Sequence, residues 1–211
     1  MPFRRIRSNR NALEQWNDQR RNRHWRLQCH PKRQTRQTRR GLCDILYYCK
    51  SLKAIHRLDL ENEQVEGICT QVNADSRDIL VRTIYRPPNQ KSEFFTAFPK
   101  LMESIWTKFW NIVILGDFNT NLLEDERGDT LYERNKILEQ FNMRNVVKGP
   151  TRIINHSKTL IVLIVTNRKD LVKQKGTCPL GISDHDMTYA TLSASIPRDQ
   201  PKIITIRNFN K

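Results

Sequence analysis

The chain has 211 residues, of which 37% are apolar, and this supports one hydrophobic core of moderate size. Its formal net charge is +15 at pH 7, which favours polyanionic partners. No apolar run approaches the ~20 residues that a transmembrane helix needs, so we expect no membrane association.

The positive charge is concentrated at the start of the chain. Residues 1–40 hold 13 Lys and Arg against Glu14 and Asp18, for +11, and the remaining residues contribute +4. With no sustained apolar period, residues 1–42 are predicted to form a basic arm that is disordered or weakly helical. Such an arm either binds a polyanion through phosphate contacts or remains a solvated tail, and both interpretations stay open.

Strand patterns follow the arm. Residues 42–48 form an apolar patch that predicts a ragged strand. Residues 65–72 and 79–85 are rich in β-branched side chains and are separated by the turn composition of residues 73–76, which predicts an antiparallel hairpin. Two prolines within residues 86–89 must end the second strand, because neither can donate a ladder hydrogen bond.

Two helices are predicted next. Ser92 has the character of an N-cap, Glu93 suits the first turn, and apolar residues recur at helical spacing over residues 94–106. Pro99 should kink or split this helix. Residues 131–141 have the pattern of a short amphipathic helix.

Buried strands complete the pattern. Residues 112–115 and 159–167 are almost continuous apolar runs, and residues 187–192 predict a last short strand. Residues 197–211 have the composition of a linker. Strands interleaved with two helices predict a layered α/β domain.

Two polar clusters carry the candidate chemistry. Asp117 and Asn119 follow the first buried strand, and Ser183, Asp184 and His185 stand together much later in the chain. A carboxylate, an amide and an imidazole could activate water against a phosphodiester. Structural roles are the alternative: Asp117 could cap a turn, and Ser183 with Asp184 could cap a helix.

The order of four motifs resembles the endonuclease/exonuclease/phosphatase superfamily, and more narrowly the endonuclease domain of non-LTR retrotransposon polyproteins. The motifs are Tyr85-Arg86-Pro87-Pro88-Asn89, Ile114-Leu115-Gly116-Asp117-Phe118-Asn119, residues 159–167, and Ser183-Asp184-His185. The resemblance covers residues 43–196 and is N-terminally incomplete, while residues 197–211 are similar to the linker that leads toward the reverse transcriptase. It implies a DNase I-like α/β fold: a partial four-layer α/β sandwich with two mostly antiparallel sheets flanked by helices.

The same resemblance implies a hydrolase that cleaves DNA with Mg²⁺ as its cofactor. It implies that Asp117 orients or deprotonates the attacking water and that Asn119 supports Asp117 and the substrate phosphate. Asp184 would bind the metal or orient the histidine, and His185 would be the base or a phosphate ligand. The residues implied to contact or lie near the substrate phosphate are Tyr85, Arg86 and Asn89.

Two departures from the family pattern indicate weak or absent activity. Val162 stands where the family has an Asp that points into the site, and no strand carrying the family's metal-binding Glu is recognisable in residues 1–42, where Glu14 lacks a strand pattern. Alternatives are a non-catalytic remnant that binds nucleic acid through its basic arm, and a small-molecule or lipid phosphatase. Missing strands would leave sheet edges unpaired, which predicts marginal stability and self-association.

Cysteine usage bears on the compartment. The five cysteines are odd in number and form no CxxC pair, and the chain does not start with a secretory apolar segment. These features predict a nuclear or cytoplasmic protein that is not secreted.

Overall fold

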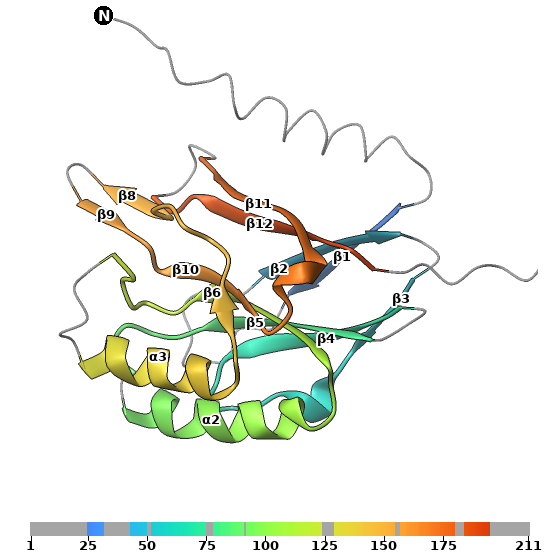
Figure 1. The fold of residues 1–211 in the computed structure, drawn as a ribbon, viewed down its shortest axis with the longest axis horizontal. Helices are drawn as coiled ribbons and strands as arrows, with labels where there is room; N and C mark the ends of the chain where they lie inside the picture. The colour runs from blue at the N-terminus through green and yellow to red at the C-terminus, as the bar shows by residue number, and fades with distance from the viewer. Residues whose placement is uncertain are drawn as a thin grey trace, which may run out of the picture.

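A mixed β-sheet organises the computed structural model (Figure 1). The structure describes residues 25–31, 43–49, 52–74, 78–90, 92–123, 129–154, 157–179 and 184–194. The sheet has six strands in the order β3-β4-β5-β6-β10-β7. Their bounds are Lys53–His56 (β3), Gly67–Asn73 (β4), Ile79–Tyr85 (β5), Asn111–Asp117 (β6), Arg144–Asn145 (β7) and Val162–Thr166 (β10). Neighbours are antiparallel except β5 and β6, which are parallel.

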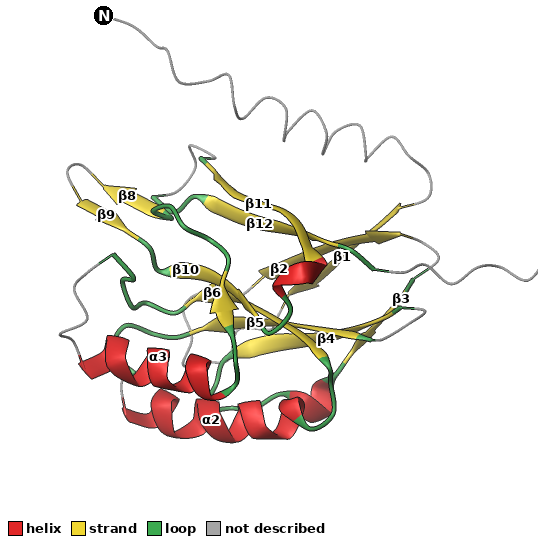
Figure 2. Cartoon of the chain, in the orientation of Figure 1, coloured by secondary structure: helices red, strands yellow, loops and turns green. Residues whose placement is uncertain are grey.

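Helix α2 (Ser92–Trp106) makes the parallel pair possible, because two parallel strands need a crossover connection. It lies with α3 (Asp129–Gln140) on one side of the sheet (Figure 2). The face of α2 that is buried includes Phe94, Phe98 and Met102, each fully covered. Because buried side chains hold both halves of the helix, Pro99 is accommodated inside one continuous α2, and the predicted split does not occur.

Strand pairs complete the layers. Strands β11 (Val172–Cys178) and β12 (Met187–Leu192) form an antiparallel pair on the side of the sheet away from the helices (Figure 1). Val172, Ala190 and Leu192 of this pair pack against the hydrophobic core. The remaining elements are β8 (Arg152–Ile154), β9 (Ser157–Thr159) and the 3₁₀ turns η1 (Leu58–Leu60) and η2 (Lys169–Leu171). This layered, mostly antiparallel arrangement confirms the predicted α/β fold class.

The segment expected to be an arm without strands contains β1 (Trp25–Pro31), and this part of the prediction is wrong. Strand β1 pairs along its whole length with β2 (Cys43–Cys49). Its signal was the alternation of Trp25, Leu27 and Cys29 with polar residues, which is the period of a strand. The many arginines between and around these residues made the segment look like a solvated basic tail, so the alternation was not recognised as a strand.

Most of the other elements agree with the sequence. The predicted hairpin is β4–β5, with Cys69 opposite Arg82, and residues 187–192 form β12 as expected. The second buried strand is shorter than predicted, because Thr159 belongs to β9 instead. Residues 1–24, with Glu14, residues 197–211 and Ser183 lie outside the described residues. Within the described ranges, no helix is long and apolar enough to cross a membrane.

Candidate functional site at the edge of the central sheet

Three strands place a row of side chains at one end of the sheet. In the register, Tyr85 on β5 lies opposite Asp117 on β6, and Asp117 lies opposite Val162 on β10. Residues directly opposed on neighbouring strands project from the same face of a sheet. The branched hydrocarbon of Val162 therefore lies beside the Asp117 carboxylate, at the position where the resemblance implies a second carboxylate.

The backbone around Asp117 depends on a glycine. Gly116 has a φ of +142°, and a Cβ atom built on it would lie 1.8 Å from the carbonyl oxygen of Ile84 on the neighbouring strand. A side chain at this position would force the two strands apart. The absence of a Cβ thus allows the close approach that brings the ends of β5 and β6 together.

The turn after β6 orients the carboxylate. Asn119 has a φ of 47°, in the left-handed region that asparagine tolerates better than most residues. Its backbone N–H donates to Asp117 Oδ1 at 2.9 Å, and its side-chain Nδ2 donates to the carbonyl of Arg86 at 2.7 Å. Asn119 therefore holds Asp117 and ties the turn to the end of β5.

Arg86 has a different part in the site from the one expected. Its side chain is 2% exposed, so it is buried rather than open to substrate. The guanidinium donates to the carbonyls of Phe118 (Nε, 2.6 Å), Asn119 (Nη2, 2.6 Å) and Gln90 (Nη1, 2.8 Å). It also donates to the hydroxyl of Thr120 at 3.0 Å. With these donors occupied, Arg86 is a positioning residue that stabilises the turn after β6. The predicted direct contact between Arg86 and a phosphate does not fit this buried placement.

Thr151 connects the second polar cluster to this edge. Its hydroxyl accepts hydrogen bonds from the backbone N–H groups of Ile161 (3.1 Å) and Val162 (3.0 Å), at the start of β10. Its carbonyl accepts from Asp186 N–H at 2.8 Å. The segment that carries His185 is thereby attached to the strand next to Asp117, and the fold brings together two motifs that are far apart in the sequence.

An ion pair that the sequence did not indicate lies beside this cluster. Arg152 Nε donates to Asp184 Oδ2 at 2.7 Å, and both side chains are partly exposed. The guanidinium lowers the pKa of the Asp184 carboxyl below its ordinary value. Arg152 follows Gly149-Pro150-Thr151, which is a turn composition, and nothing local in the sequence identifies its partner 32 residues further along.

Asp117 combines burial with positive surroundings. Desolvation raises the pKa of its carboxyl above the ordinary value, while the hydrogen bond from Asn119 and the charges of His185, Arg86 and Arg152 oppose that rise. These charges act on Asp117 because the fold places all of them around it. A partly buried carboxylate with cations on several sides is an arrangement suited to an anionic ligand.

No family sequence model matches the chain, and no curated protein sequence matches it. Among solved structures, the endonuclease domain of TRAS1, a telomere-specific non-LTR retrotransposon, matches with a TM-score of 0.62 and 14% identity, over 90% of this chain and 93% of that one. The chain has the endonuclease/exonuclease/phosphatase fold, also called DNase I-like.

Two further structures share the endonuclease/exonuclease/phosphatase fold with this chain. The 3′ phosphatase NExo from Neisseria, bound to product DNA hairpin, has a TM-score of 0.56 at 13% identity, over 90% of this chain and 85% of that one. An endonuclease/exonuclease/phosphatase family protein from Leptotrichia buccalis has a TM-score of 0.52 at 15% identity, over 92% and 81%. At such identities the likeness establishes the fold alone.

The divalent cation that this endonuclease/exonuclease/phosphatase fold implies does not fit the described residues. Among them, no three His, Cys, Asp or Glu side chains converge on one point. Asp184, the expected ligand, is paired with Arg152, and Val162 offers no oxygen. A cation between Asp117 and Asp184 would also lie close to a guanidinium, and like charges repel.

The two remaining predicted site residues differ in their surroundings. Tyr85 is partly buried at the end of β5, in line with Asp117. Asn89 is exposed in the turn after it, where Gln90 N–H donates to the carbonyl of Pro87 at 3.1 Å. The geometry thus groups Tyr85 with Asp117, and it places Asn89 on the surface of the adjoining turn.

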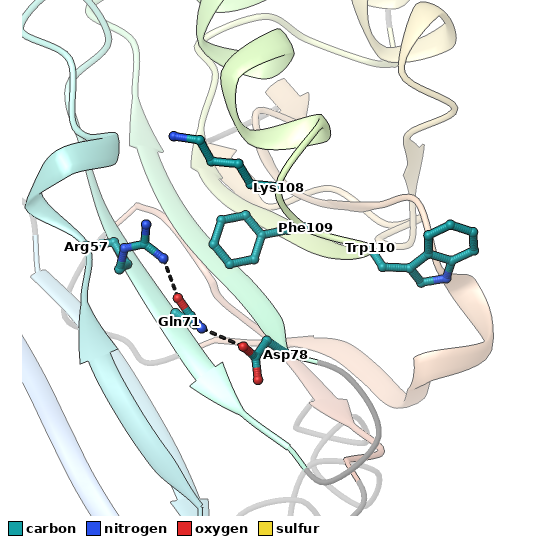
Figure 3. Close-up of a pocket in the computed structure, with 6 residues that line it drawn as sticks. All are labelled: Arg57, Gln71, Asp78, Lys108, Phe109 and Trp110. Carbon is teal, nitrogen blue, oxygen red and sulfur yellow. Dashed lines mark hydrogen bonds between the residues drawn. The ribbon is translucent and has the colours of Figure 1, made fainter.

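A pocket of about 480 Å³ lies at the other end of the same strands (Figure 3). Asp78 and Trp110, which line it, immediately precede β5 and β6, whereas Tyr85 and Asp117 end them. Gln71 bridges Arg57 and Asp78 through hydrogen bonds there. Because these polar groups satisfy one another, we assign the chemistry to the Asp117 edge and not to this pocket.

Proposed function

We propose that this chain binds nucleic-acid phosphodiesters at the sheet edge around Asp117 and cleaves them slowly, as an endonuclease-type domain of a non-LTR retrotransposon with reduced activity. The fold that it shares with the TRAS1 endonuclease domain supports the class of substrate. So does the DNA hairpin bound to NExo. The observation that carries the proposal is Val162 directly beside Asp117, because a hydrocarbon at this position leaves Asp117 without a second carboxylate and supports the reduced activity that we propose.

Asp117 is the general base in this proposal. Asn119 N–H fixes Oδ1, and among the described residues no hydrogen bond reaches Oδ2, which can accept one from the attacking water. Burial raises the pKa of the carboxyl, and a higher pKa makes it a stronger proton acceptor. The water attacks phosphorus, its proton passes to Asp117, and the bond to the leaving oxygen breaks.

His185 and Tyr85 complete the reaction. His185 lies near enough to Asp117 for its charge to act on that carboxyl, and in its protonated form it can donate a proton to the leaving oxygen. Tyr85, in register with Asp117, contacts a phosphate oxygen through its hydroxyl. In this proposal Tyr85 stabilises charge on the phosphate oxygen, and His185 stabilises charge on the leaving oxygen.

Val162 limits the rate. A hydrocarbon cannot accept a hydrogen bond or orient a polar partner, so one preorganised group is missing from the transition state. The loss of one such group commonly lowers the rate by about 10²–10³-fold. Restoring a carboxylate at this position should therefore recover much of the activity.

The test is nicking of supercoiled plasmid by wild type, Val162→Asp and the isosteric control Val162→Asn, with and without Mg²⁺. We expect Val162→Asp to nick at least about tenfold faster than Val162→Asn, and Asp117→Asn in the same background to abolish the gain. Thermal unfolding would verify that each variant folds. Equal, negligible nicking by all variants would refute slow catalysis and favour the alternative of a non-catalytic nucleic-acid-binding protein.

A further inference from the structure

Arg152 is a cation at the site that the proposed reaction does not use. It begins β8, stands opposite His185 in an isolated antiparallel bridge, and pairs with Asp184. Resting on the proposed function, we propose that Arg152 is a phosphate-binding residue that takes the place of a divalent cation at this site. Asp184 is then its counter-ion when no nucleic acid is bound, and not a metal ligand.

The backbone around Arg152 is held on both sides of the bridge. Ile153 N–H donates to the carbonyl of Asp184 at 3.3 Å, and Asp186 N–H donates to the carbonyl of Thr151 at 2.8 Å. Directly opposed residues of an antiparallel pair project from the same face. The bridge therefore sets the backbones of Arg152 and His185 side by side, and the charges of both side chains act on Asp117.

The donors of Arg152 leave room for a phosphate. Only Nε is used, on Asp184, and among the described residues neither terminal nitrogen donates to a protein acceptor. A guanidinium can offer two parallel N–H donors to the oxygens of a phosphate. Arg86 is the contrast, because it is buried and all three of its nitrogens donate to the protein.

Arg152 can exchange Asp184 for a phosphate at little energetic cost. The side chains are 38% and 42% exposed, and ion pairs at such positions contribute little to stability because water screens them. A phosphate that approaches Asp117 is repelled by its carboxylate, so a cation must offset that charge. Of the three side chains whose positive charge acts on Asp117, Arg86 is buried and bonded to backbone carbonyls, and His185 contributes only when protonated. Arg152 is the permanent cation that a phosphate can reach, because its side chain is 38% exposed.

The experiment measures binding of a short fluorescent DNA duplex by anisotropy in EDTA. Arg168→Gln is the matched control for Arg152→Gln, because Arg168 forms the same kind of exposed pair with Asp170, at 2.6 Å, away from the site. We expect Arg152→Gln to bind about tenfold more weakly than Arg168→Gln. The slope of log affinity against log salt should fall by about 0.9, as for one lost phosphate contact.

A second pair of variants should change DNA affinity in the opposite direction. Asp184→Asn removes the competing carboxylate, so it should bind the duplex more tightly than the control Asp170→Asn, equally in EDTA and in Mg²⁺ at matched ionic strength. If Asp184 were a metal ligand, Asp184→Asn would instead weaken binding in Mg²⁺ alone. That result would overturn the inference.

The two proposals fail in different ways. If His185→Ala weakens binding but Arg152→Gln equals Arg168→Gln, the assignment of Arg152 is wrong and the proposed site stands. If neither His185→Ala nor Arg152→Gln differs from Arg168→Gln, the site itself does not bind phosphodiesters. Equal urea midpoints for the variants and wild type would establish that altered binding is not altered folding.

Discussion

Arg86→Lys offers a sharp test of how the Asp117 turn is held. Arg86 donates four hydrogen bonds from three nitrogens, to three backbone carbonyls and one hydroxyl. A lysine keeps the positive charge but has one nitrogen, which cannot reach all of these acceptors at once. Two or three buried acceptors would lose their donor.

The expected cost follows from those acceptors. Each buried polar group left unsatisfied costs about 1–3 kcal/mol. Two of the four bonds are only partly buried, so at about 1.5 kcal/mol for each of two or three acceptors Arg86→Lys should lower the free energy of unfolding by about 3–5 kcal/mol. That is a large share of the ~5–15 kcal/mol that stabilises a typical domain. At a typical urea m-value of about 2 kcal/mol/M, the midpoint would fall by about 2 M.

Urea denaturation followed by tryptophan fluorescence would measure this shift. Arg168→Lys is the control, since its exposed pair with Asp170 should change stability by less than about 1 kcal/mol. The reasoning is refuted if Arg86→Lys unfolds at the wild-type urea concentration. If Arg86→Lys keeps the wild-type stability but loses DNA binding, Arg86 contacts the substrate directly, as the resemblance implied.

Two further predictions concern the same turn. Gly116→Ala should lower the free energy of unfolding by more than about 3 kcal/mol, because its Cβ would overlap the Ile84 carbonyl, whereas Gly149→Ala, with no atom within 4 Å of its Cβ, should be tolerated. Similar melting temperatures for the two variants would contradict the close strand approach. Asp117→Asn should increase the free energy of unfolding at pH 7, because the raised pKa of the Asp117 carboxyl means that its ionisation destabilises the folded state at that pH. The gain should disappear as pH falls below the ordinary Asp pKa, and a gain independent of pH in urea denaturation would contradict it.

Local patterns in the sequence were sufficient for most elements. Alternating and continuous apolar runs predicted the β4–β5 hairpin, β6 and β12, and helical spacing predicted α2 and α3. These signals are readable because each depends on residues close in sequence. They failed where a second signal competed: arginines concealed β1, and Pro99 suggested a break that packing on both halves of α2 prevents.

The candidate site divides in the same way. Asp117 and Asn119 follow a buried strand, so the sequence alone determined that a carboxylate and an amide would stand at a strand end. The resemblance placed Val162 at the position of a missing carboxylate, and the register of β6 with β10 sets the two side by side. The glycine before Asp117 is likewise explained by a contact with another strand.

Only the tertiary structure decided what the arginines do. Arg86 and Arg152 look equally available in the sequence, since each stands in a proline-containing turn. Their roles differ because one guanidinium is buried against carbonyls more than 30 residues away, whereas the other is partly exposed beside Asp184. The hydrogen bonds of a side chain depend on which acceptors the fold brings within about 3 Å of its donors. Partners that are distant in the sequence leave no local pattern in a single sequence.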